Sequence, residues 1–404
     1  MNTSLLYHAF KMRNMDYVSC VCKYNTTYIK LRPRTPLKRC PNCFSRNIVK
    51  NGVRERTFIG LPVGMRRTLF RVPLHRYVCR DCGYDKQEPI SFARGSRHYT
   101  NGFATLVIDL LKMGTIKDVA AFLGVTWDTV KGIHKDFLKS RYSPPSIKNV
   151  HNIGIDEFAV RKGHIYKTIV VDLDTGHIIH VGNSKGKEAL KGFWNRVRRN
   201  NIRLENIATD LSSAFIAAVT ENAPSANLIF DHFHVVKLMN DAVDDIRRTQ
   251  YTMERDLNNR AVLKGTRWLL LMNGTDKMDK QHRTRLDNAL ALNKPLAQAY
   301  YLKESLREIW TQVDKASAEI VLYDWVEQAR SSGQKQLVKM GNTIMAHRTG
   351  ILAWYDAHLS TGKLEGINNK IKVLKRVAYG YRDDEYFKLR LFALHDNRIT
   401  RNLG

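Results

Sequence analysis

The chain of 404 residues lacks any long hydrophobic run. No apolar stretch reaches the roughly 20 residues that a membrane-spanning helix needs, and the first residues contain no apolar segment like that of a secretion signal. We therefore expect an intracellular, cytoplasmic protein. A hydrophobic content of 43% with 26% charged residues also argues against an intrinsically disordered chain. The length is enough for about two to four domains with cores of their own.

Cysteine is absent beyond residue 82, although the first 82 residues contain all 6 cysteines. Intracellular chains rarely keep disulfides, so this clustering indicates a metal site. Four of the cysteines form two C-x-x-C pairs, and four thiolates are enough to close a tetrahedral structural zinc site. The alternative, four unrelated reduced cysteines, explains two matched pairs less well. The expected zinc ligands are Cys40, Cys43, Cys79 and Cys82.

Acidic residues are scarce, because 38 Asp and Glu stand against 66 Lys and Arg, a formal net charge of +28. The excess is concentrated: residues 1–150 hold 27 Lys and Arg against 9 Asp and Glu, a net of +18. A chain that is basic only for solubility would not need that concentration. We infer a polyanionic partner, nucleic acid, contacted mainly by the N-terminal part.

Between the two cysteine pairs, basic and apolar residues alternate over residues 53–74, which predicts a β-ribbon. We expect two of its basic residues, Arg66 and Arg67, to contact the nucleic acid. The remaining cysteines, Cys20 and Cys22, alternate with apolar residues ahead of the ribbon. We expect both to be buried in a strand.

Residues 103–140 show helical periodicity with a break at Gly124. One apolar helix face ends there, and Thr126 can cap a second helix. Helix, glycine turn and capped helix form the pattern of a helix-turn-helix, although such pairs also occur as plain packing units. We expect Trp127 and Lys131 to face outward on the second helix and to contact DNA.

Farther along the chain, strand-like segments alternate with helical ones. The first such strand ends at Asp156 and the fourth at Asp210, and three antiparallel strands followed by alternating helix and strand is the order of the ribonuclease-H-like fold. In that fold the first and fourth strands are neighbours, so the two carboxylates should lie close together. Taken alone, Asp156 is better explained as a strand-end cap or as the ion-pair partner of a lysine. The expected strands span residues 152–155, 166–173, 177–181, 202–209 and 227–230.

Residues from about 240 to 350 show only helical periodicity and predict an all-helical insertion. We expect Trp268 in its core, the alternative being a grip on a flipped base. The last part of the chain begins near residue 360 with a helix whose apolar positions form a buried stripe. Four polar residues share the neighbouring face, where a glutamate one turn from a lysine is most often a solvated ion pair. These residues are Glu365, Asn369, Lys372 and Arg376.

With these features the chain resembles the DDE transposases of bacterial insertion sequences, specifically the ISL-three family, which joins a zinc ribbon, a helix-turn-helix and a catalytic core. The resemblance covers nearly the whole chain in the family's order. It is carried most strongly by the segments IGIDE (153–157), ATDLS (208–212), DHFHV (231–235) and LEGINNKIK (364–372).

The resemblance implies that Asp156, Asp210 and Glu365 bind the catalytic metal ions and that His234 belongs to a D-x-x-H element of the site. Magnesium, or manganese, suits this set because both prefer carboxylate and water oxygens. Two such ions about 4 Å apart would activate the attacking oxygen and stabilise the leaving oxygen. Without a cation, three converging carboxylates would raise one another's pKa. A bound metal ion would offset this repulsion and so explains why the carboxylates are grouped.

The resemblance also implies a transposase that binds the ends of its element, cleaves the DNA and transfers the strand. Its partners would be double-stranded DNA, as terminal inverted repeats and as target, and further copies of the chain in a homodimer or higher oligomer. Lys372 and Arg376 would hold the DNA backbone, and the protein would act at the nucleoid. Two alternatives stay open: a ribonuclease-H-like nuclease that cleaves without joining, and a transposase-derived, sequence-specific DNA-binding protein with an inactive core.

We therefore expect a multidomain α+β chain in which a ribonuclease-H-like α/β catalytic core is interrupted by an all-helical insertion. The proline-containing stretch 143–146 (SPPS) indicates a linker ahead of that core. The expected division is a zinc-ribbon DNA-binding domain (1–98), a helix-turn-helix domain (99–142), the first part of the core (143–240), the insertion (241–350) and the second part of the core with the Glu-bearing helix (351–404).

Overall fold

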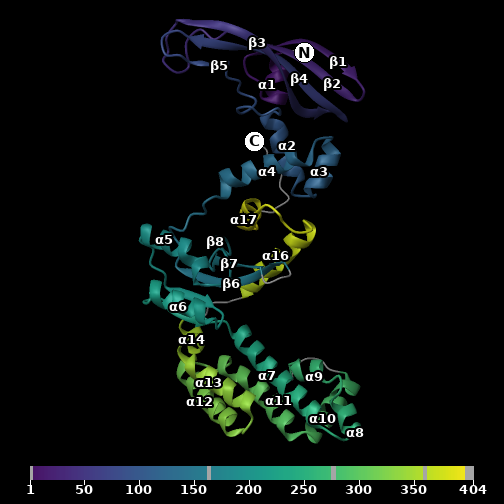
Figure 1. Ribbon diagram of the computed structural model, residues 1–404, viewed down its shortest axis with the longest axis vertical. Helices are drawn as coiled ribbons and strands as arrows, with labels where there is room; N and C mark the ends of the chain where they lie inside the picture. The colour runs from purple at the N-terminus through teal and green to yellow at the C-terminus, as the bar shows by residue number, and fades with distance from the viewer. Residues whose placement is uncertain (1–2, 162–164, 274–278, 358–361, 396–404) are drawn as a thin grey trace. The chain divides into compact units, whose positions relative to one another are not determined.

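A computed structural model describes residues 3–161, 165–273, 279–357 and 362–395. The chain forms two compact units (Figure 1): the N-terminal unit of residues 1–143 and 381–404, and the core unit of residues 144–380. None of the described helices is long and apolar enough to cross a membrane. The four domain boundaries expected from the sequence stay predictions.

The N-terminal unit contains a five-stranded sheet with the order β1-β2-β4-β3, in which β5 also pairs with β4. A long antiparallel hairpin of β3 and β4 supplies most of it, as the alternation of basic and apolar residues predicted. One face packs on α1 (Thr3–Phe10) around the fully buried rings of Phe58 and Phe70. The strands are β1 (Met15–Lys23), β2 (Thr26–Pro33), β3 (Ile48–Val63), β4 (Arg66–Cys79) and β5 (Asp85–Gln87).

Three helices follow this sheet and confirm the predicted helix-turn-helix. Thr115 and Asp118 form a reciprocal capping box at the start of α3, and Gly124 ends that helix in the left-handed conformation with φ of 63°. Thr126 caps α4 by accepting a hydrogen bond from the backbone N–H of Thr129. The helices are α2 (Asn101–Leu110), α3 (Ile116–Leu123) and α4 (Trp127–Tyr142), and α17 (Asp384–Phe392) packs against α4 in the same unit.

The core unit contains a second five-stranded sheet with the order β10-β9-β6-β7-β8. Its strands β6, β7 and β8 are antiparallel neighbours, whereas β9 and β10 continue the sheet in parallel on the other side of β6. This is the predicted ribonuclease-H-like order, and it makes the first and fourth strands neighbours. The elements are β6 (Asn152–Arg161), β7 (Ile165–Asp172), β8 (Ile178–Asn183), η1 (Lys187–Leu190), α5 (Lys191–Arg199), β9 (Asn206–Thr209), α6 (Ser213–Asn222), β10 (Asn227–Phe230) and α16 (Gly362–Val377).

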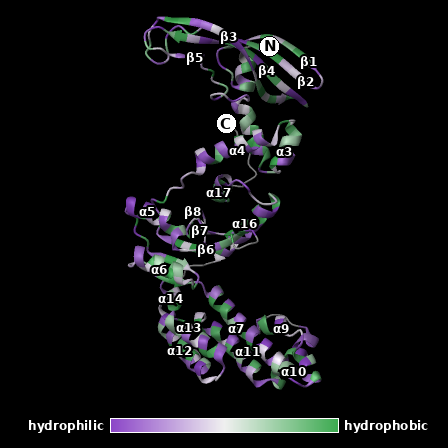
Figure 2. Ribbon diagram, viewed as in Figure 1, coloured by the Kyte–Doolittle hydropathy of each residue, from purple (hydrophilic) through white to green (hydrophobic). Residues whose placement is uncertain are grey.

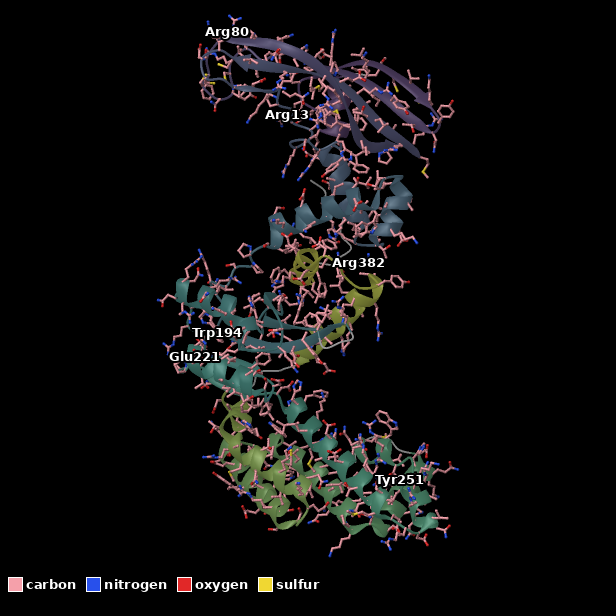
Figure 3. All side chains as sticks on the ribbon, viewed as in Figure 1. Arg13, Arg80, Trp194, Glu221, Tyr251 and Arg382 are labelled. Carbon is pink, nitrogen blue, oxygen red and sulfur yellow. The ribbon has the colours of Figure 1, made fainter. Side chains whose placement is uncertain are left out.

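Successive side chains of β6 point to opposite faces of the sheet, and different helices cover the two faces. Ile153 and Ile155 share an apolar core with residues of α5 and α6, among them the buried Trp194, which is labelled in Figure 3. Gly154 and Asp156 face α16 instead. The central strand therefore buries apolar residues on one side and presents a carboxylate to a helix on the other.

α16 runs along β6 in the same direction. A helix rises about 1.5 Å per residue and a strand about 3.3 Å. The 11 residues between the first and last contacts on α16 and the 5 residues between them on β6 both advance about 17 Å, so the two elements stay in step. In order along both elements, the contacts are Leu364 over Gly154, Asn368 with Asp156, and Lys375 with the carbonyl oxygen of Ala159.

Alanine at position 154 should disturb this arrangement. Its Cβ would lie 2.7 Å from Cδ2 of Leu364 and 3.0 Å from Cδ2 of Leu173, and both leucines are buried. We expect Gly154→Ala to lower the free energy of unfolding in urea by about 1–3 kcal/mol, as overpacking does. Gly366→Ala is the control, because nothing lies within 4 Å of the added Cβ and the better helix propensity should stabilise α16. Equal unfolding energies for the two variants would contradict the close approach.

The remainder of the core unit is helical in its described residues, as predicted for the insertion. Its helices share one apolar core that includes Trp325 and reaches Phe230 of β10, where α14 packs. Figure 2 shows hydrophilic and hydrophobic residues alternating around these helices, as in amphipathic helices on a shared core. The helices are α7 (His232–Met253), α8 (Leu257–Leu263), α9 (Arg267–Leu271), α10 (Lys280–Leu292), α11 (Lys294–Leu306), η2 (Arg307–Trp310), α12 (Lys315–Ser331), α13 (Lys335–Ala346), α14 (Arg348–Leu352) and α15 (Trp354–Ala357).

Two predictions about burial are wrong. Trp268 is 69% exposed, because the short helix α9 turns Leu269 and Leu270 toward the core and Trp268 away from it. Cys20 and Cys22 are exposed, because β1 is the edge strand of its sheet and no other described element buries these side chains. Both errors concern which side chains of an apolar segment are buried, and this depends on contacts with residues far along the chain.

Candidate active site

The three parallel strands of the core unit share one sequence pattern, an asparagine followed four residues later by an aspartate: NIGID, NIATD and NLIFD. The asparagines form a ladder across the strands. Asn206 Nδ2 donates to Asn152 Oδ1 (2.8 Å), and Asn227 Nδ2 donates to Asn206 Oδ1 (3.1 Å). The ladder lies on the paired residues of all three strands and so fixes their register. Extended past the last paired residues, the same register brings Asp156, within β6, to the level of Asp210 and Asp231, which directly follow β9 and β10.

Asp156 and Asp210 each accept hydrogen bonds in this arrangement. Asp156 is 8% exposed and accepts from the backbone N–H of Glu157 (2.7 Å) and from Nδ2 of Asn368 on α16 (2.5 Å). Asp210 follows the end of β9 and accepts from the backbone N–H of Ser212 (3.1 Å). These bonds hold each carboxylate in place but leave oxygen lone pairs free for a further ligand.

Asp231 and His234 form the third part of the site, at the start of α7. One Asp231 oxygen accepts from the backbone N–H of Phe233 (3.0 Å), and the other lies 3.1 Å from Nδ1 of His234. That contact raises the pKa of His234 above its ordinary value against the opposing effect of burial, and the charges of Asp156 and Asp210 add to the rise. The raised pKa favours the protonated imidazole, whose charge would balance part of the negative charge of these aspartates.

Burial raises the pKa of Asp156, and the neighbouring Asp210 carboxylate adds to that rise. The backbone N–H of Glu157, the imidazole of His234 and the amide of Asn368 act in the opposite direction without cancelling it. The site is thus a cluster of carboxylate oxygens with too little positive charge of its own. Hard oxygen donors of this kind fit a divalent ion such as magnesium.

Glu365 lies on α16 as predicted, but its side chain is exposed. Within the described residues, the cysteine tetrad is the only group of three or more potential ligands whose ligand atoms all lie within 4.8 Å of one another. Glu365, Asp156 and Asp210 are therefore not at metal-bridging spacing in this structure. The α16 residue that contacts Asp156 is Asn368, three positions after Glu365.

Three polar residues of α16 occupy the same strip as Glu365, in agreement with the predicted spacing. Lys372 and Arg376 are exposed there, and Lys372 Nζ lies 3.3 Å from Oδ1 of Asn369. Asn368 had no predicted role, although an amide one turn from a candidate metal-binding glutamate was a usable signal. The repeated N-x-x-x-D pattern was a second such signal.

The four predicted zinc ligands come together in the N-terminal unit. Their Sγ atoms all lie within 4.8 Å of one another, with Cys40 3.6 Å from Cys82 and Cys43 3.6 Å from Cys79. A tetrahedral zinc ion with Zn–S bonds of about 2.3 Å sets its sulfur atoms about 3.8 Å apart, so the tetrad fits that ion. The side-chain amide of Asn42 donates to Cys82 and is the largest cause lowering the pKa of that thiol to about 6.

The two C-x-x-C pairs adopt the same turn. The backbone N–H of Phe44 donates to the carbonyl of Cys40 (2.9 Å), and that of Gly83 donates to the carbonyl of Cys79 (3.1 Å). Phe44 and Gly83 both have positive φ, of 60° and 68°. Glycine adopts this conformation freely, whereas a bulky residue such as Phe44 is strained in it. The strained turn persists where it directs two thiols toward one point.

The predicted DNA contacts of the N-terminal unit differ in their surroundings. Trp127, Arg66 and Arg67 are exposed. Lys131 is half-buried and engaged, because its Nζ lies 2.9 Å from the Asp383 carboxylate and 5.2 Å from the centre of the Trp127 ring. A basic residue of the second helix therefore has an acidic partner from the C-terminal part of the chain.

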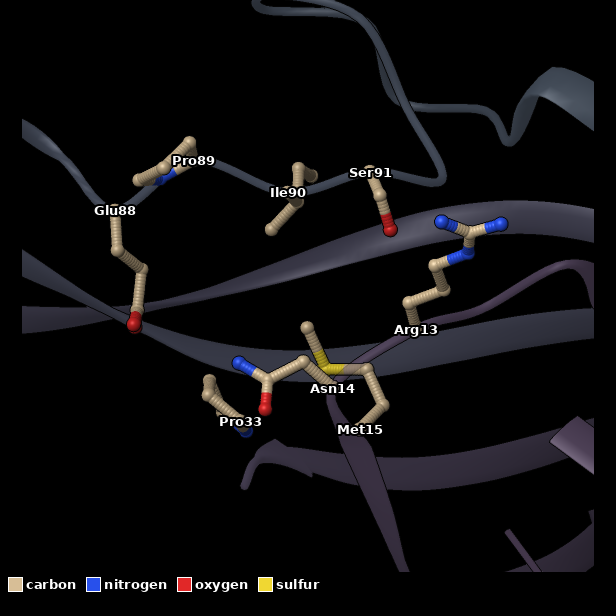
Figure 4. Close-up of a pocket in the computed structure, with 8 residues that line it drawn as sticks. All are labelled: Arg13, Asn14, Met15, Pro33, Glu88, Pro89, Ile90 and Ser91. Atoms are coloured by element: carbon tan, nitrogen blue, oxygen red, sulfur yellow. The ribbon is translucent and has the colours of Figure 1, made fainter. Parts of the chain in front are cut away.

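A cavity of about 150 Å³ lies in the N-terminal unit beside the start of β1 (Figure 4). Its acidic residue, Glu88, accepts a hydrogen bond from the backbone N–H of His75 (2.7 Å) and lies 3.2 Å from Nδ1 of the same residue. The other polar groups of the lining, Arg13, Asn14 and Ser91, do not form a catalytic or metal-binding set. The aspartates of the N-x-x-x-D patterns and the cysteine tetrad remain the candidate sites.

Sequence models of protein families match three successive parts of the chain. Residues 36–82 match the zinc-finger of transposase IS204/IS1001/IS1096/IS1165, residues 88–138 match the helix-turn-helix domain of transposase family ISL3, and residues 153–391 match a model of that family described as transposase. These matches cover, in order, the cysteine tetrad, the helix-turn-helix and the sheet with its carboxylates.

Individual proteins are similar as well. The transposase for insertion sequence element IS1001 of Bordetella parapertussis is 33% identical over 371 residues, which is 91% of this chain and 91% of that protein. The transposase for insertion sequence element IS1557 of Mycobacterium tuberculosis is 26% identical over 398 residues, 92% of this chain and 89% of that protein. Among solved structures, the Drosophila P element transposase strand transfer complex covers 76% of this chain and 94% of its own, with a TM-score of 0.41 and 9% identity.

Proposed function

The chain belongs to the ISL3 family of insertion-sequence transposases, and we propose that it binds the ends of its own element and cleaves and joins DNA beside Asp156 of β6 and Asp210, which directly follows β9. The observation that carries this proposal is the register of the parallel strands, which brings Asp156 and Asp210 to one level beside α16. His234, held by Asp231, supplies positive charge at the same place.

Asp156, Asp210 and Glu365 would hold the catalytic magnesium or manganese ions. When bound, two such ions activate an attacking oxygen and stabilise a leaving oxygen. The assignment of Glu365 is supported by its place one helical turn before Asn368, the residue that already contacts Asp156. Asn368 positions the Asp156 carboxylate, and His234 offsets the negative charge of the aspartates.

DNA would be held by basic residues on both units. Lys372 and Arg376 are exposed on the Glu365 strip of α16, where they can bind the phosphate backbone next to the reacting group. In the N-terminal unit, Trp127 and Lys131 on α4, and Arg66 and Arg67 at the start of β4, would contact the element ends. Because two ends must be joined, we propose that the active form on DNA is a homodimer or a higher oligomer, acting at the nucleoid.

The cysteine tetrad would hold one structural zinc ion through Cys40, Cys43, Cys79 and Cys82. Its role is architectural, since it ties the loop before β3 to the end of β4. We further propose the division of the chain at residues 98, 142, 240 and 350, with α17 as an addition to the helix-turn-helix.

The test is a strand-transfer assay with purified protein and DNA fragments that flank its coding sequence. With magnesium or manganese present, we expect cleavage at the element ends and joining to a target plasmid. Without added divalent ions, we expect binding and no cleavage, because the carboxylates alone supply neither an activated nucleophile nor a stabilised leaving group. Cleavage without joining would identify a nuclease, and binding without cleavage under all conditions would identify a DNA-binding protein with an inactive core.

A further inference from the structure

The first turn of α17 lies against a strip of lysines on α4. The strip consists of residues one helical turn apart, and each is paired with a carboxylate of α17 or of its N-cap. The Asp383 carboxylate lies 2.9 Å from Lys131 and 3.0 Å from Lys135. The Glu385 carboxylate lies 2.8 Å from Lys135 and 3.1 Å from Lys139. Two acidic residues thus engage the three lysines of one helix face.

Apolar packing anchors α17 independently of these charges. Tyr386 and Leu389 are buried against Leu138 of α4, and the hydroxyl of Tyr386 lies 2.8 Å from Nδ1 of the buried His134. Contacts of this kind hold a helix in place without any ion pair, and exposed ion pairs add little to stability. The position of α17 therefore does not require acidic residues opposite the lysines.

The lysine strip is also the basic side of α4. The neighbouring exposed row of the helix, about 60° farther round, carries Asp128, Gly132 and Asp136, and Asp136 lies 2.6 Å from the guanidinium of Arg97. Phosphate groups would be repelled by the acidic residues of that row and attracted to the lysines. In the structure, carboxylate oxygens lie at hydrogen-bonding distance from the lysines, where phosphate oxygens would otherwise bind.

The Asp383 carboxylate is firmly ionised. Burial raises its pKa, but the backbone N–H of Tyr386 and the ammonium groups of Lys131 and Lys135 outweigh burial and hold the pKa well below its usual range. Its charge is therefore constant over the whole pH range in which DNA binding is measured. A phosphate group can gain these lysines only by taking the place of this carboxylate.

We propose that the first turn of α17 occupies the phosphate-binding strip of α4, so that duplex DNA must displace the carboxylates of Asp383 and Glu385 to bind the helix-turn-helix. This inference rests on the proposed DNA-binding function. Non-specific binding consists almost entirely of phosphate contacts. Carboxylates that compete with phosphate therefore weaken non-specific DNA binding most. Binding to specific sites, which adds contacts to the bases, is weakened by a smaller fraction.

The experiment compares matched variants of the full-length protein with its zinc bound. Asp383→Asn removes one charge and keeps the N-cap of α17, because asparagine caps as well as aspartate. Asp384→Asn is the control, since it removes the same charge from the neighbouring residue, whose carboxylate lies 3.5 Å from Lys388 of the same helix. A double variant adds Glu385→Gln. The probe is a fluorescein-labelled duplex of mixed sequence, titrated by anisotropy over a series of salt concentrations.

We expect Asp383→Asn and the double variant to bind progressively more tightly than wild type, and Asp384→Asn to match wild type. The double variant should gain about two phosphate contacts, which steepens the plot of log K against log salt by about 2 and raises affinity roughly tenfold. Thermal unfolding should stay close to wild type, because Tyr386 and Leu389 still anchor the helix.

Three results would overturn the inference. Equal affinity and salt dependence in wild type and double variant would mean that the carboxylates do not compete with phosphate. Weaker binding by the double variant would mean that they support the DNA-binding conformation. An equal gain of affinity in Asp384→Asn would mean that the effect comes from the net charge of the protein and not from these ion pairs. Absence of duplex binding in wild type and all variants would instead reject the proposed DNA-binding function, and the inference with it.

Discussion

Replacing Glu365 by glutamine is expected to abolish DNA cleavage and strand transfer while leaving binding to the element ends nearly unchanged. Glutamine keeps the shape of the side chain but removes the negative charge that a divalent ion needs from its ligand. Loss of one charged group from a site that stabilises a transition state costs on the order of 10³-fold in rate, and loss of a metal ion costs more. Because Glu365 is exposed on α16, the substitution should not lower stability.

The measurement is the strand-transfer assay run beside a binding titration on the same DNA. Glu205→Gln is the matched control, because Glu205 is an exposed glutamate directly before β9, at the end of that strand opposite Asp210. We expect wild-type rates from that control. Asp156→Asn and Asp210→Asn should lose activity as Glu365→Gln does. Normal strand transfer by Glu365→Gln would reject this glutamate as a ligand.

If Glu365 were rejected, Asp231 would be the next candidate, since its strand brings it to the level of the other two aspartates. In that case we expect Asp231→Asn, and not Glu365→Gln, to abolish cleavage. The two assignments differ in the role of His234. With Glu365 as third ligand, Asp231 serves to hold and charge the imidazole, so Asp231→Asn should weaken activity without abolishing it.

The sheet of the core unit could be predicted because local sequence patterns determine it. Alternating apolar residues define each strand. The N-x-x-x-D repeat, which the prediction did not use, marks the aligned positions of β6, β9 and β10. Once β6 and β9 are neighbours, the position of Asp210 beside Asp156 follows from the register. The helix-turn-helix was predictable for the same reason, since its caps at Thr115 and Thr126 and its turn at Gly124 lie within a few residues of one another.

Contacts between distant parts of the chain could not be predicted in this way. The hydrogen bond from Asn368 to Asp156 joins residues 212 positions apart, and it depends on how closely α16 approaches Gly154. The pairing of α17 with α4 is equally distant, and nothing in the spacing of Lys131 points to Asp383. The exposure of Trp268 was misjudged because a short apolar segment has two sides and the sequence does not say which one is covered.

Replacing Cys79 by serine is expected to remove zinc from the N-terminal unit and to destabilise the ribbon. Cys79 is 1% exposed and ends β4, whose last residues pair with β5 and with the start of β3. Binding of a structural zinc ion contributes about 10–16 kcal/mol to the folding of isolated zinc fingers. The sheet has an apolar core of its own around Phe58 and Phe70, so we expect a smaller loss here, of several kcal/mol. Zinc content by elemental analysis should fall from about one ion per chain to none.

Cys20→Ser is the control for that experiment, because Cys20 is an exposed thiol on edge strand β1 of the same sheet. It should keep the zinc ion and change the free energy of unfolding by less than about 0.5 kcal/mol, as exposed substitutions do. Without zinc, the end of β4 and the loop that carries Cys40 lose their connection, so DNA binding by the N-terminal unit should weaken in Cys79→Ser alone. Equal zinc content in the two variants would reject the tetrad as a metal site and would leave the strained turn at Phe44 without a cause.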